Sequence, residues 1–194
     1  MAVSRSLLCI PYGGLNDSLV QIAKCYVYAK ECGRRLLVDT SRSGLFLAFD
    51  ELFAFSDDWG RANAVSIDSS LVDPLDGVKS VFPVEFRGGV DRVGIKHVIS
   101  PGYKGYVFAD SGNATSFDFG RDYEEDLLVH LNCGGGIQSH GLFSVLALSG
   151  AVRQRVLSRM ALLPAEYLAV HVRNTDMRSD FLPFFREVAP MAAG

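Results

Sequence analysis

Residues 6–40 read SLLCIPYGGLNDSLVQIAKCYVYAKECGRRLLVDT, and this stretch decides the fold class. The apolar run at residues 6–11 predicts a buried strand, and the two glycines that follow predict a tight turn. Apolar residues at helical spacing then predict a helix, with Asp17 and Ser18 as its capping residues and Gly33 as the C′ residue that ends it. The next apolar run, Leu-Leu-Val, predicts a second strand. A strand, a helix and a strand in this order are typical of a parallel sheet.

The rest of the chain predicts more elements of the same α/β class. Residues 126–131 predict another buried strand, which three glycines follow at 134–136. A helix is predicted from residue 141 to residue 160. The aromatic stretch at 41–55 predicts a short packing helix, because Phe46, Phe49, Leu52 and Phe53 follow a near-helical spacing. A further strand is predicted at 167–173. Shorter strands, separated by Gly, Pro and Asp turns, are predicted at residues 65–67, 80–86, 97–99 and 106–109.

We therefore expect an α/β protein with a Rossmann-like parallel sheet and flanking helices. The 194 residues are enough to bury a substantial core. A first domain is expected over residues 1–163, and residues 164–194 are expected to begin a second domain.

Composition and charge exclude several classes of function. The formal net charge is −3 and no long run of Lys or Arg occurs, so the basic surface of a nucleic-acid binder is not expected. The apolar run near the N-terminus is too short to span a bilayer or to form a signal peptide, which predicts a cytoplasmic protein. The four cysteines lack metal-ligand spacing, so we expect free thiols and no metal. They are Cys9, Cys25, Cys32 and Cys133.

A second stretch, YLAVHVRNTD at residues 167–176, places polar residues at the end of an apolar strand. In open parallel sheets, ligands bind beyond the carboxyl ends of the strands, and the planar guanidinium of arginine matches a phosphate. Arg173 is therefore the leading candidate for a contact with an anionic ligand. Alternatively, Arg173 is a surface residue paired with Asp176 or Asp180, and His171 shares its face only because strand side chains alternate.

The turn at Gly13 and Gly14 is a second candidate site. It lies between a strand and the start of a helix, where backbone N–H groups and the helix dipole favour an anion or a sugar hydroxyl. A tight turn that needs positive φ explains the glycines equally well, and Asn16 is then only a helix cap. The turn lacks the GxGxxG spacing of a dinucleotide site. The glycines at 134–136 permit the same two interpretations and rank second, because no polar anchor is beside them.

Three motifs occur in a fixed order along the chain: PYGGLNDSL at 11–19, RLLVD at 35–39 and HVRNTD at 171–176. Together they resemble the fucosyltransferase superfamily of GT-B fold glycosyltransferases, which includes alpha-1,6-fucosyltransferases and protein O-fucosyltransferases. That superfamily has a glycine-rich first turn that carries an asparagine, and an HxR motif that opens its second Rossmann-like domain.

The resemblance implies transfer of a sugar from a GDP-sugar donor to a glycan acceptor. In the superfamily the HxR arginine binds the β-phosphate, which gives this role to Arg173. A fixed guanidinium offsets charge on the departing diphosphate, so neither a metal nor another cofactor is implied. His171, Thr175 and Asp176 would share the donor pocket.

The resemblance also gives roles to the first turn. Gly13, Gly14 and Asn16 would face the same cleft from the first domain, with Asn16 near the transferred sugar or the acceptor hydroxyl. Asp17 is the candidate base that deprotonates the acceptor.

The resemblance covers residues 6–40 and 127–188. In the superfamily the second domain continues well beyond HxR, so residues 164–194 are expected to begin an incomplete nucleotide-sugar-binding domain. A completing chain or a second copy of this chain is then expected, and an uncovered edge on the strand at 167–172 favours a homodimer.

Two other functions remain open. The chain could be a non-catalytic α/β module that binds a glycan or a partner chain. It could also be a small hydrolase with Cys133 as nucleophile and His130 or His140 as base.

Overall fold

The structure is a computed structural model that describes residues 5–71, 77–101, 103–135, 138–164, 166–167, 182–183 and 186–187. The chain divides into two compact units, Met1–Val152 and Arg153–Gly194. The five-stranded sheet lies entirely in the first unit. The expected domain boundary near residue 163 stays a prediction.

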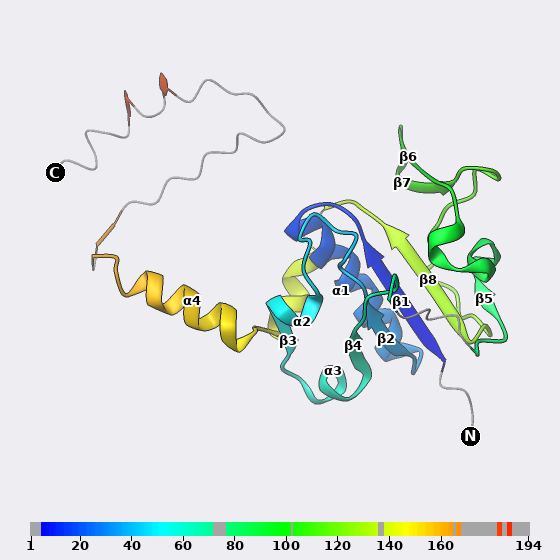
Figure 1. Cartoon of the computed structure of the whole chain (residues 1–194), viewed down its shortest axis with the longest axis horizontal. Helices are drawn as coiled ribbons and strands as arrows, with labels where there is room; N and C mark the ends of the chain where they lie inside the picture. Colours follow the sequence, from blue (N-terminus) through cyan, green and yellow to red (C-terminus); the bar gives the residue numbers. More distant parts are fainter. Residues whose placement is uncertain are drawn as a thin grey trace. The chain divides into compact units, whose positions relative to one another are not determined.

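A parallel sheet of five strands forms the centre of the first unit (Figure 1), which confirms the expected fold class. The strand order is β4, β2, β1, β8, β5, and every pairing is parallel. The strands are β1 (Ser6–Pro11), β2 (Arg35–Val38), β4 (Ala64–Ser66), β5 (Val81–Phe82) and β8 (Leu127–Asn132). Residues 7–10 of β1 are fully buried, which is why the middle strand is continuously apolar rather than alternating.

The side chains of β1 alternate between two hydrophobic cores. Leu7 and Cys9 pack with the helix α1 (Leu15–Glu31) on one face of the sheet. Leu8 and Ile10 pack on the other face with residues such as Phe86. Because successive strand side chains point to opposite faces, this one strand anchors both layers of the unit.

The helix α1 ends as the sequence predicts but begins differently. Its C-cap is Cys32, Gly33 has a φ of +62°, and the N–H of Arg34 donates to Ala29 O at 2.8 Å, as in a Schellman motif. At the other end Gly14 is the N-cap and no side chain caps the helix, so the prediction that Asp17 or Ser18 caps it is wrong. The helix starts directly on the glycine turn, because the turn itself sets the direction of the chain.

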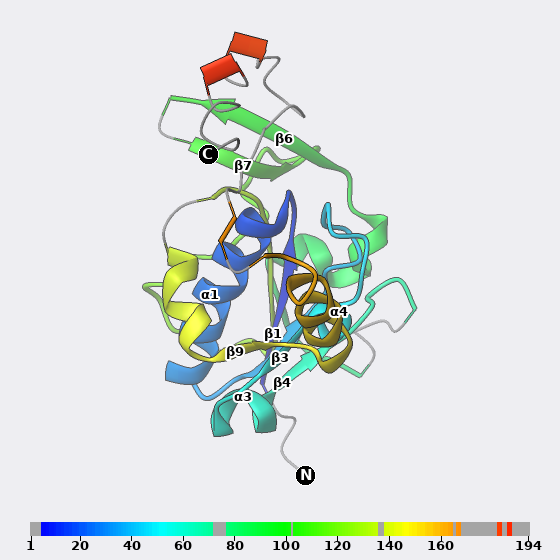
Figure 2. The same ribbon diagram turned by 90° about the vertical axis from the view of Figure 1, so that its left-hand side faces the viewer.

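The second face of the sheet is covered by two 3₁₀ helices, η1 (Val84–Gly88) and η2 (Val90–Arg92), and by a hairpin. The hairpin strands are β6 (Ile95–Ser100) and β7 (Tyr103–Phe108), and Figure 2 shows them beyond the upper end of β1. The strands expected near 65–67, 97–99 and 106–109 are confirmed. The strand expected over 80–86 is only the two-residue β5, because Pro83 has no N–H to continue the ladder.

The helix expected from residue 141 to residue 160 is wrong as one element. The chain instead forms η3 (Gln138–Ser144), β9 (Leu146–Leu148) and α4 (Gly150–Met160). The strand β9 pairs antiparallel with β3 (Phe53–Phe55). This long-range pairing overrides the helical spacing of the apolar residues.

The short helix expected within 41–55 is confirmed only as α2 (Phe49–Leu52). Phe49 is buried, but Phe46, which we expected to pack with it, is 82% exposed. Phe53 belongs to β3 instead of the helix.

The single tryptophan, Trp59, lies in the helix α3 (Asp58–Asn63) and packs against the first core. Its ring meets that of Tyr26 edge to face at 5.0 Å, and Tyr26 also stacks on Phe55 at 5.2 Å. The Tyr26 hydroxyl donates to Asp57 at 2.5 Å, and burial together with this carboxylate raises the pKa of Tyr26. This aromatic group fixes the outer side of α1.

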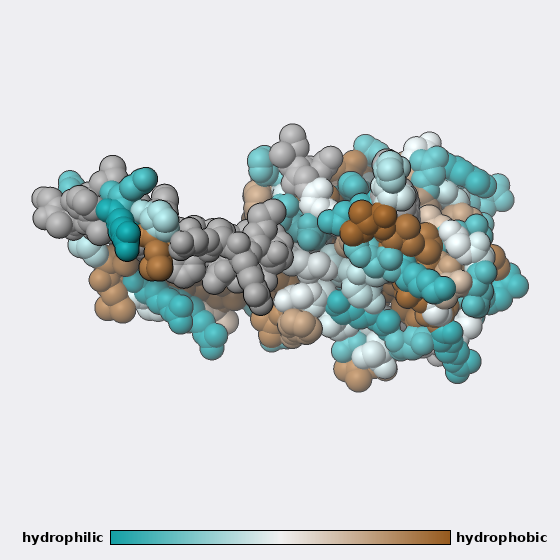
Figure 3. All heavy atoms as spheres, turned by 90° about the horizontal axis from the view of Figure 1, so that it is seen from above, coloured by the Kyte–Doolittle hydropathy of each residue, from teal (hydrophilic) through white to brown (hydrophobic). Residues whose placement is uncertain are grey.

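The surface is mixed in character. Seen from above, hydrophobic and hydrophilic residues alternate over the face that Figure 3 shows. Among the residues that the structure describes, no helix has both the length and the apolar character needed to cross a membrane.

Candidate functional site

The carboxyl ends of β1, β2 and β8 lie side by side at one edge of the sheet. Pro11 is in register with Asn132, and the N–H of Tyr12 donates to Asn132 O at 2.8 Å. The N–H of Asp39 donates to Cys9 O at 2.9 Å, so the loop after β2 starts at the same edge. Ligands of parallel sheets bind at this kind of edge.

The first glycine turn is tightly packed from two sides. Gly13 has a φ of +100°, and a Cβ on it would lie 2.6 Å from Oδ2 and 2.8 Å from Cβ of Asp17. On its other side, the N–H of Gly44 donates to Gly13 O at 2.7 Å, and a Cβ on Gly44 would lie 2.9 Å from that oxygen. Side chains at either position would therefore displace the turn.

The Asp17 carboxylate lies between the two glycine turns. A Cβ on Gly135 would lie 2.7 Å from Oδ1 of Asp17 and 3.0 Å from Nδ2 of Asn16. Asn16 is also tied to η3, because the Ser139 hydroxyl donates to its Oδ1 at 3.1 Å. In the described parts of the chain, no hydrogen-bond donor contacts the Asp17 carboxylate. The structure therefore brings together the turn at Gly13 and Gly14, which was the first candidate from the sequence, and the turn at Gly134 and Gly135, which was the second.

The start of α1 offers backbone donors next to this carboxylate. The first helical hydrogen bond runs from Ser18 N to Gly14 O at 2.9 Å, and the N-cap residue Gly14 makes no side-chain hydrogen bond to the helix. Backbone N–H groups at the positive end of a helix favour an oxygen-rich or anionic ligand. Donors and an acceptor thus lie within one turn of helix.

A buried carboxylate supports the loop behind the first turn. Asp39 is fully buried and accepts hydrogen bonds from the N–H and the hydroxyl of Ser41, at 2.9 and 2.6 Å. It also accepts from the hydroxyl of Ser69 and, at 3.1 Å, from its N–H. A buried carboxylate is costly unless it is hydrogen-bonded in this way, so Asp39 fixes the loop that carries Gly44.

A buried relay supports the second glycine turn. His130 Nε2 and Gln21 Oε1 are 2.8 Å apart, and Gln21 Nε2 donates to Gly134 O at 2.9 Å. Because the amide nitrogen is used by Gly134, its oxygen must accept, which assigns the proton of His130 to Nε2. Burial, with a smaller contribution from the positive charge of Lys24, lowers the pKa of His130 to about 3, so the ring is neutral.

Cys133 has a different partner from those that the sequence suggested. His130 points to Gln21, whereas His97 Nε2 lies 3.4 Å from Cys133 Sγ. Burial raises the pKa of Cys133, and the nearby Asp17 raises it further against the opposing effect of Lys104. A thiol held protonated is a poor nucleophile, which disfavours the Cys-dependent hydrolase.

Aromatic rings border the glycine turns. Tyr12 packs against Tyr106 in a tilted arrangement with 4.7 Å between the ring centroids, and His97 lies against the same ring at 5.0 Å. Arg42 pairs with Asp91, and although burial alone would lower the pKa of Arg42, this carboxylate and the Tyr12 hydroxyl raise it. Sequence reasoning missed these contacts, because the residues are far apart in the chain and no motif connects them.

The site residues of the second motif lie outside the described residues. These are His171, Arg173, Thr175 and Asp176. Their roles stay predictions, and so does the homodimer expected from the strand at 167–172.

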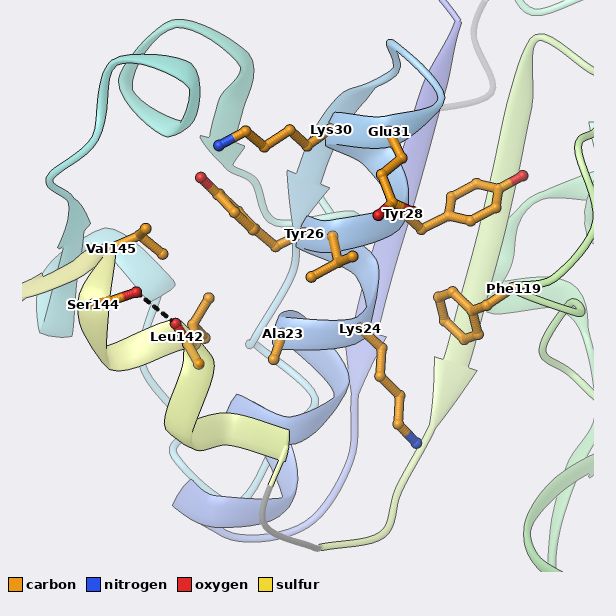
Figure 4. A pocket seen from close by; sticks show the side chains of 12 residues that line it. Ala23, Lys24, Tyr26, Tyr28, Lys30, Glu31, Phe119, Leu142, Ser144 and Val145 are labelled. Atoms are coloured by element: carbon orange, nitrogen blue, oxygen red, sulfur yellow. Dashed lines mark hydrogen bonds between the residues drawn. The ribbon is translucent and has the colours of Figure 1, made fainter.

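A separate groove lies along the outer side of α1 (Figure 4). Its volume is about 950 Å³, and its walls are mostly apolar side chains such as Ala23, Phe119, Leu142 and Val145. The Ser144 hydroxyl already donates to Gly141 O at 2.8 Å. The lining of the groove also includes Lys24, Lys30 and Glu31, but the groove does not lie at the carboxyl ends of the parallel strands, so the sheet edge is the better candidate site.

No known protein family and no curated protein sequence matches this chain. Solved structures do match in fold. The chain is similar to fucosyltransferase NodZ from Bradyrhizobium, with 17% identity and a TM-score of 0.53 over 81% of this chain and 55% of that one. It is similar also to a NodZ alpha-1,6-fucosyltransferase co-crystallized with GDP, with 16% identity and a TM-score of 0.51 over the same shares. The chain thus spans about half the length of these proteins and shares a fucosyltransferase-like α/β fold.

Proposed function

We propose that this chain acts as a glycosyltransferase of the fucosyltransferase type, which moves a sugar from a GDP-sugar to a glycan acceptor. The observation that carries the proposal is the Gly13–Gly14 turn, which places the N-terminus of α1 and the Asp17 carboxylate at the carboxyl edge of the sheet. The fold likeness supports it, because one of the similar fucosyltransferases was co-crystallized with GDP.

On the donor side, Arg173 carries the main role. Its guanidinium binds the β-phosphate and offsets the negative charge that grows as the diphosphate leaves, so no metal is required. His171, Thr175 and Asp176 line the same pocket. Gly13 and Gly14 let the donor approach the backbone of the first turn.

On the acceptor side, Asp17 is the base. An acceptor hydroxyl oxygen attacks the anomeric carbon of the donor sugar, and the bond from that carbon to the phosphate oxygen breaks with its electron pair on the diphosphate. The hydroxyl proton passes to the Asp17 carboxylate, for which the described residues offer no competing donor. Asn16 orients the hydroxyl or the transferred sugar.

The remaining parts of the proposal concern assembly. Residues 164–194 begin the nucleotide-sugar-binding domain, and this chain associates with a second copy or with another chain. The alignments cover 55% of the similar fucosyltransferases, so part of each of those proteins lies outside the region shared with this chain.

The test is GDP binding by calorimetry on the full chain, with GDP release from GDP-fucose as the assay for transfer. Arg173→Ala should weaken GDP binding about tenfold or more, since a charge-assisted hydrogen bond to phosphate is worth about 1.5–3 kcal/mol. Arg159→Ala, which changes an exposed arginine on α4, is the matched control and should bind GDP like the parent. Absence of GDP binding in the parent chain, or equal binding by both variants, would contradict the proposal.

A further inference from the structure

The β6–β7 hairpin presents one face whose character changes along its length. Its register pairs Ile95 with Phe108, His97 with Tyr106 and Ile99 with Lys104. Directly opposite side chains on alternate positions share one face of an antiparallel pair. We call this set of side chains, completed by Tyr12, the hairpin face.

The base of the hairpin face is buried and its outer end is open. Phe108 is 2% exposed and its ring meets that of Phe86 at 5.0 Å, which anchors the hairpin in the second core. Ile99, four residues beyond Ile95 on the same strand, is 71% exposed. A hydrophobic side chain is thus held in solvent on an anchored scaffold.

The middle of the hairpin face meets both glycine turns. The Tyr106 ring packs against that of Tyr12, which directly precedes Gly13. His97 contacts Cys133, which directly precedes Gly134. The backbone of this segment is fixed, because the N–H of Thr115 donates to Tyr106 O at 3.1 Å and its hydroxyl donates to Leu131 O at 2.5 Å. The hairpin face therefore lies beside the two glycine turns and the Asp17 carboxylate between them, and its backbone is held in place by these hydrogen bonds.

We propose that the hairpin face binds a sugar ring of an uncharged oligosaccharide, next to the Asp17 carboxylate. This inference rests on the proposed function, because it identifies the surface that would hold the acceptor. A pyranose ring has a face of C–H groups, which packs on aromatic and aliphatic side chains such as His97 and Ile99. Its hydroxyls form hydrogen bonds with charged groups, here Asp17 and Lys104.

The charges at this surface favour a neutral polyhydroxyl ligand. Lys104 is the one formally charged residue of the hairpin face, and the Asp17 carboxylate lies beside that face. An anionic ligand on the hairpin face would gain one ammonium but meet one carboxylate, whereas a purely apolar ligand would remove water from both charges without replacing it. A sugar satisfies the carboxylate, the ammonium and the apolar groups together.

The experiment titrates the full chain with chitotetraose, cellotetraose and mannotetraose by calorimetry, without any nucleotide. At least one of them should bind with a dissociation constant of about 1 mM or tighter. His97→Ala and Ile99→Ser should each weaken that binding about fivefold or more, because each removes part of the stacking surface.

Lys96→Ala is the matched control, since Lys96 is exposed on the opposite face of the same strand. It should bind the oligosaccharide like the parent. Failure of all three sugars to bind, unchanged binding in both hairpin-face variants, or an equal loss in Lys96→Ala would overturn the inference. Circular dichroism of each variant establishes that it is folded, and Tyr106→Phe, which keeps the stacked ring, should retain binding.

The outcome is separable from that of the proposed function. Oligosaccharide binding that depends on His97 and Ile99, in a chain that neither binds GDP nor transfers sugar, supports the hairpin face and contradicts the transferase. It would then favour the non-catalytic glycan-binding module. GDP binding and sugar transfer that stay unchanged in both His97→Ala and Ile99→Ser would support the transferase and contradict the hairpin face as the surface that holds the acceptor.

Discussion

The two glycine turns follow neighbouring parallel strands, yet different parts of the molecule hold them in place. The first, at Gly13, is fixed by local contacts with Asp17 and by the N–H of Gly44. The second, at Gly134, is fixed from the core through Gln21 and His130. The first turn thus depends on close packing and on a backbone hydrogen bond from Gly44, and the second depends on a side-chain relay. Substitutions in either turn can therefore alter a site between them, and their effects on stability and on sugar transfer should differ.

The largest effect should come from protonating the relay. The pKa of His130 is about 3 in the folded protein and about 6.5 in the unfolded chain, so the unfolded state binds the extra proton as the pH falls below 6.5. Stability is therefore fully present above pH 6.5 and declines toward pH 3. From pH 7 to pH 4 we expect this residue to remove about 3 kcal/mol from the free energy of unfolding.

Denaturant unfolding followed by circular dichroism at several pH values measures this loss. His130→Gln should flatten the pH dependence, whereas His140→Gln, at an exposed position, should keep it. If both variants show the slope of the parent, the relay does not have the role assigned to it.

The next effect should come from the backbone of the first turn. Gly13→Ala forces a side chain into positive φ and against Cβ of Asp17, and we expect it to lower the free energy of unfolding by about 2–3 kcal/mol. Gly14→Ala is the matched control, because its φ is −77° and no atom lies within 4 Å of the added Cβ. That variant should lose less than about 1 kcal/mol. Equal losses in urea unfolding would show that the first turn is not locally strained.

The smallest effect on stability should come from the second turn. In Gly135→Ala the new methyl meets only the ends of the Asp17 and Asn16 side chains, which can move, so the loss should be below about 1 kcal/mol. The same substitution displaces the Asp17 carboxylate from its place between the turns. We therefore expect a clear loss of sugar transfer with only a small loss of stability. Transfer assays and thermal unfolding measure the two effects. Gly134→Ala should show the opposite pattern, a larger loss of stability with a smaller loss of sugar transfer, because Gly134 has a φ of +119°.

Local patterns in the sequence predict the first part of the fold well. The apolar run of β1, the helical spacing of α1 and the C′ position of Gly33 are all encoded by neighbouring residues, and the structure confirms them. The region from 141 to 160 is different. There the pairing of β9 with β3 depends on a segment about ninety residues away, which no periodicity near residue 146 can reveal.

The candidate site divides in the same way. The glycine turn and its asparagine are contiguous, so the sequence alone singled them out. The partners that surround them, His97 at Cys133 and Tyr106 at Tyr12, come from a hairpin that folds back onto the sheet edge. Such contacts are a product of tertiary packing, and a single sequence carries no short-range signal for them.

The position of Trp59 has a practical consequence. The indole lies among the rings of Tyr26 and Phe55, on the side of α1 away from the sheet edge where the glycine turns meet. Its fluorescence therefore follows opening of the first core and should be insensitive to a molecule that occupies the edge. The chain thus carries an intrinsic optical probe that separates unfolding from ligand occupancy within a single titration.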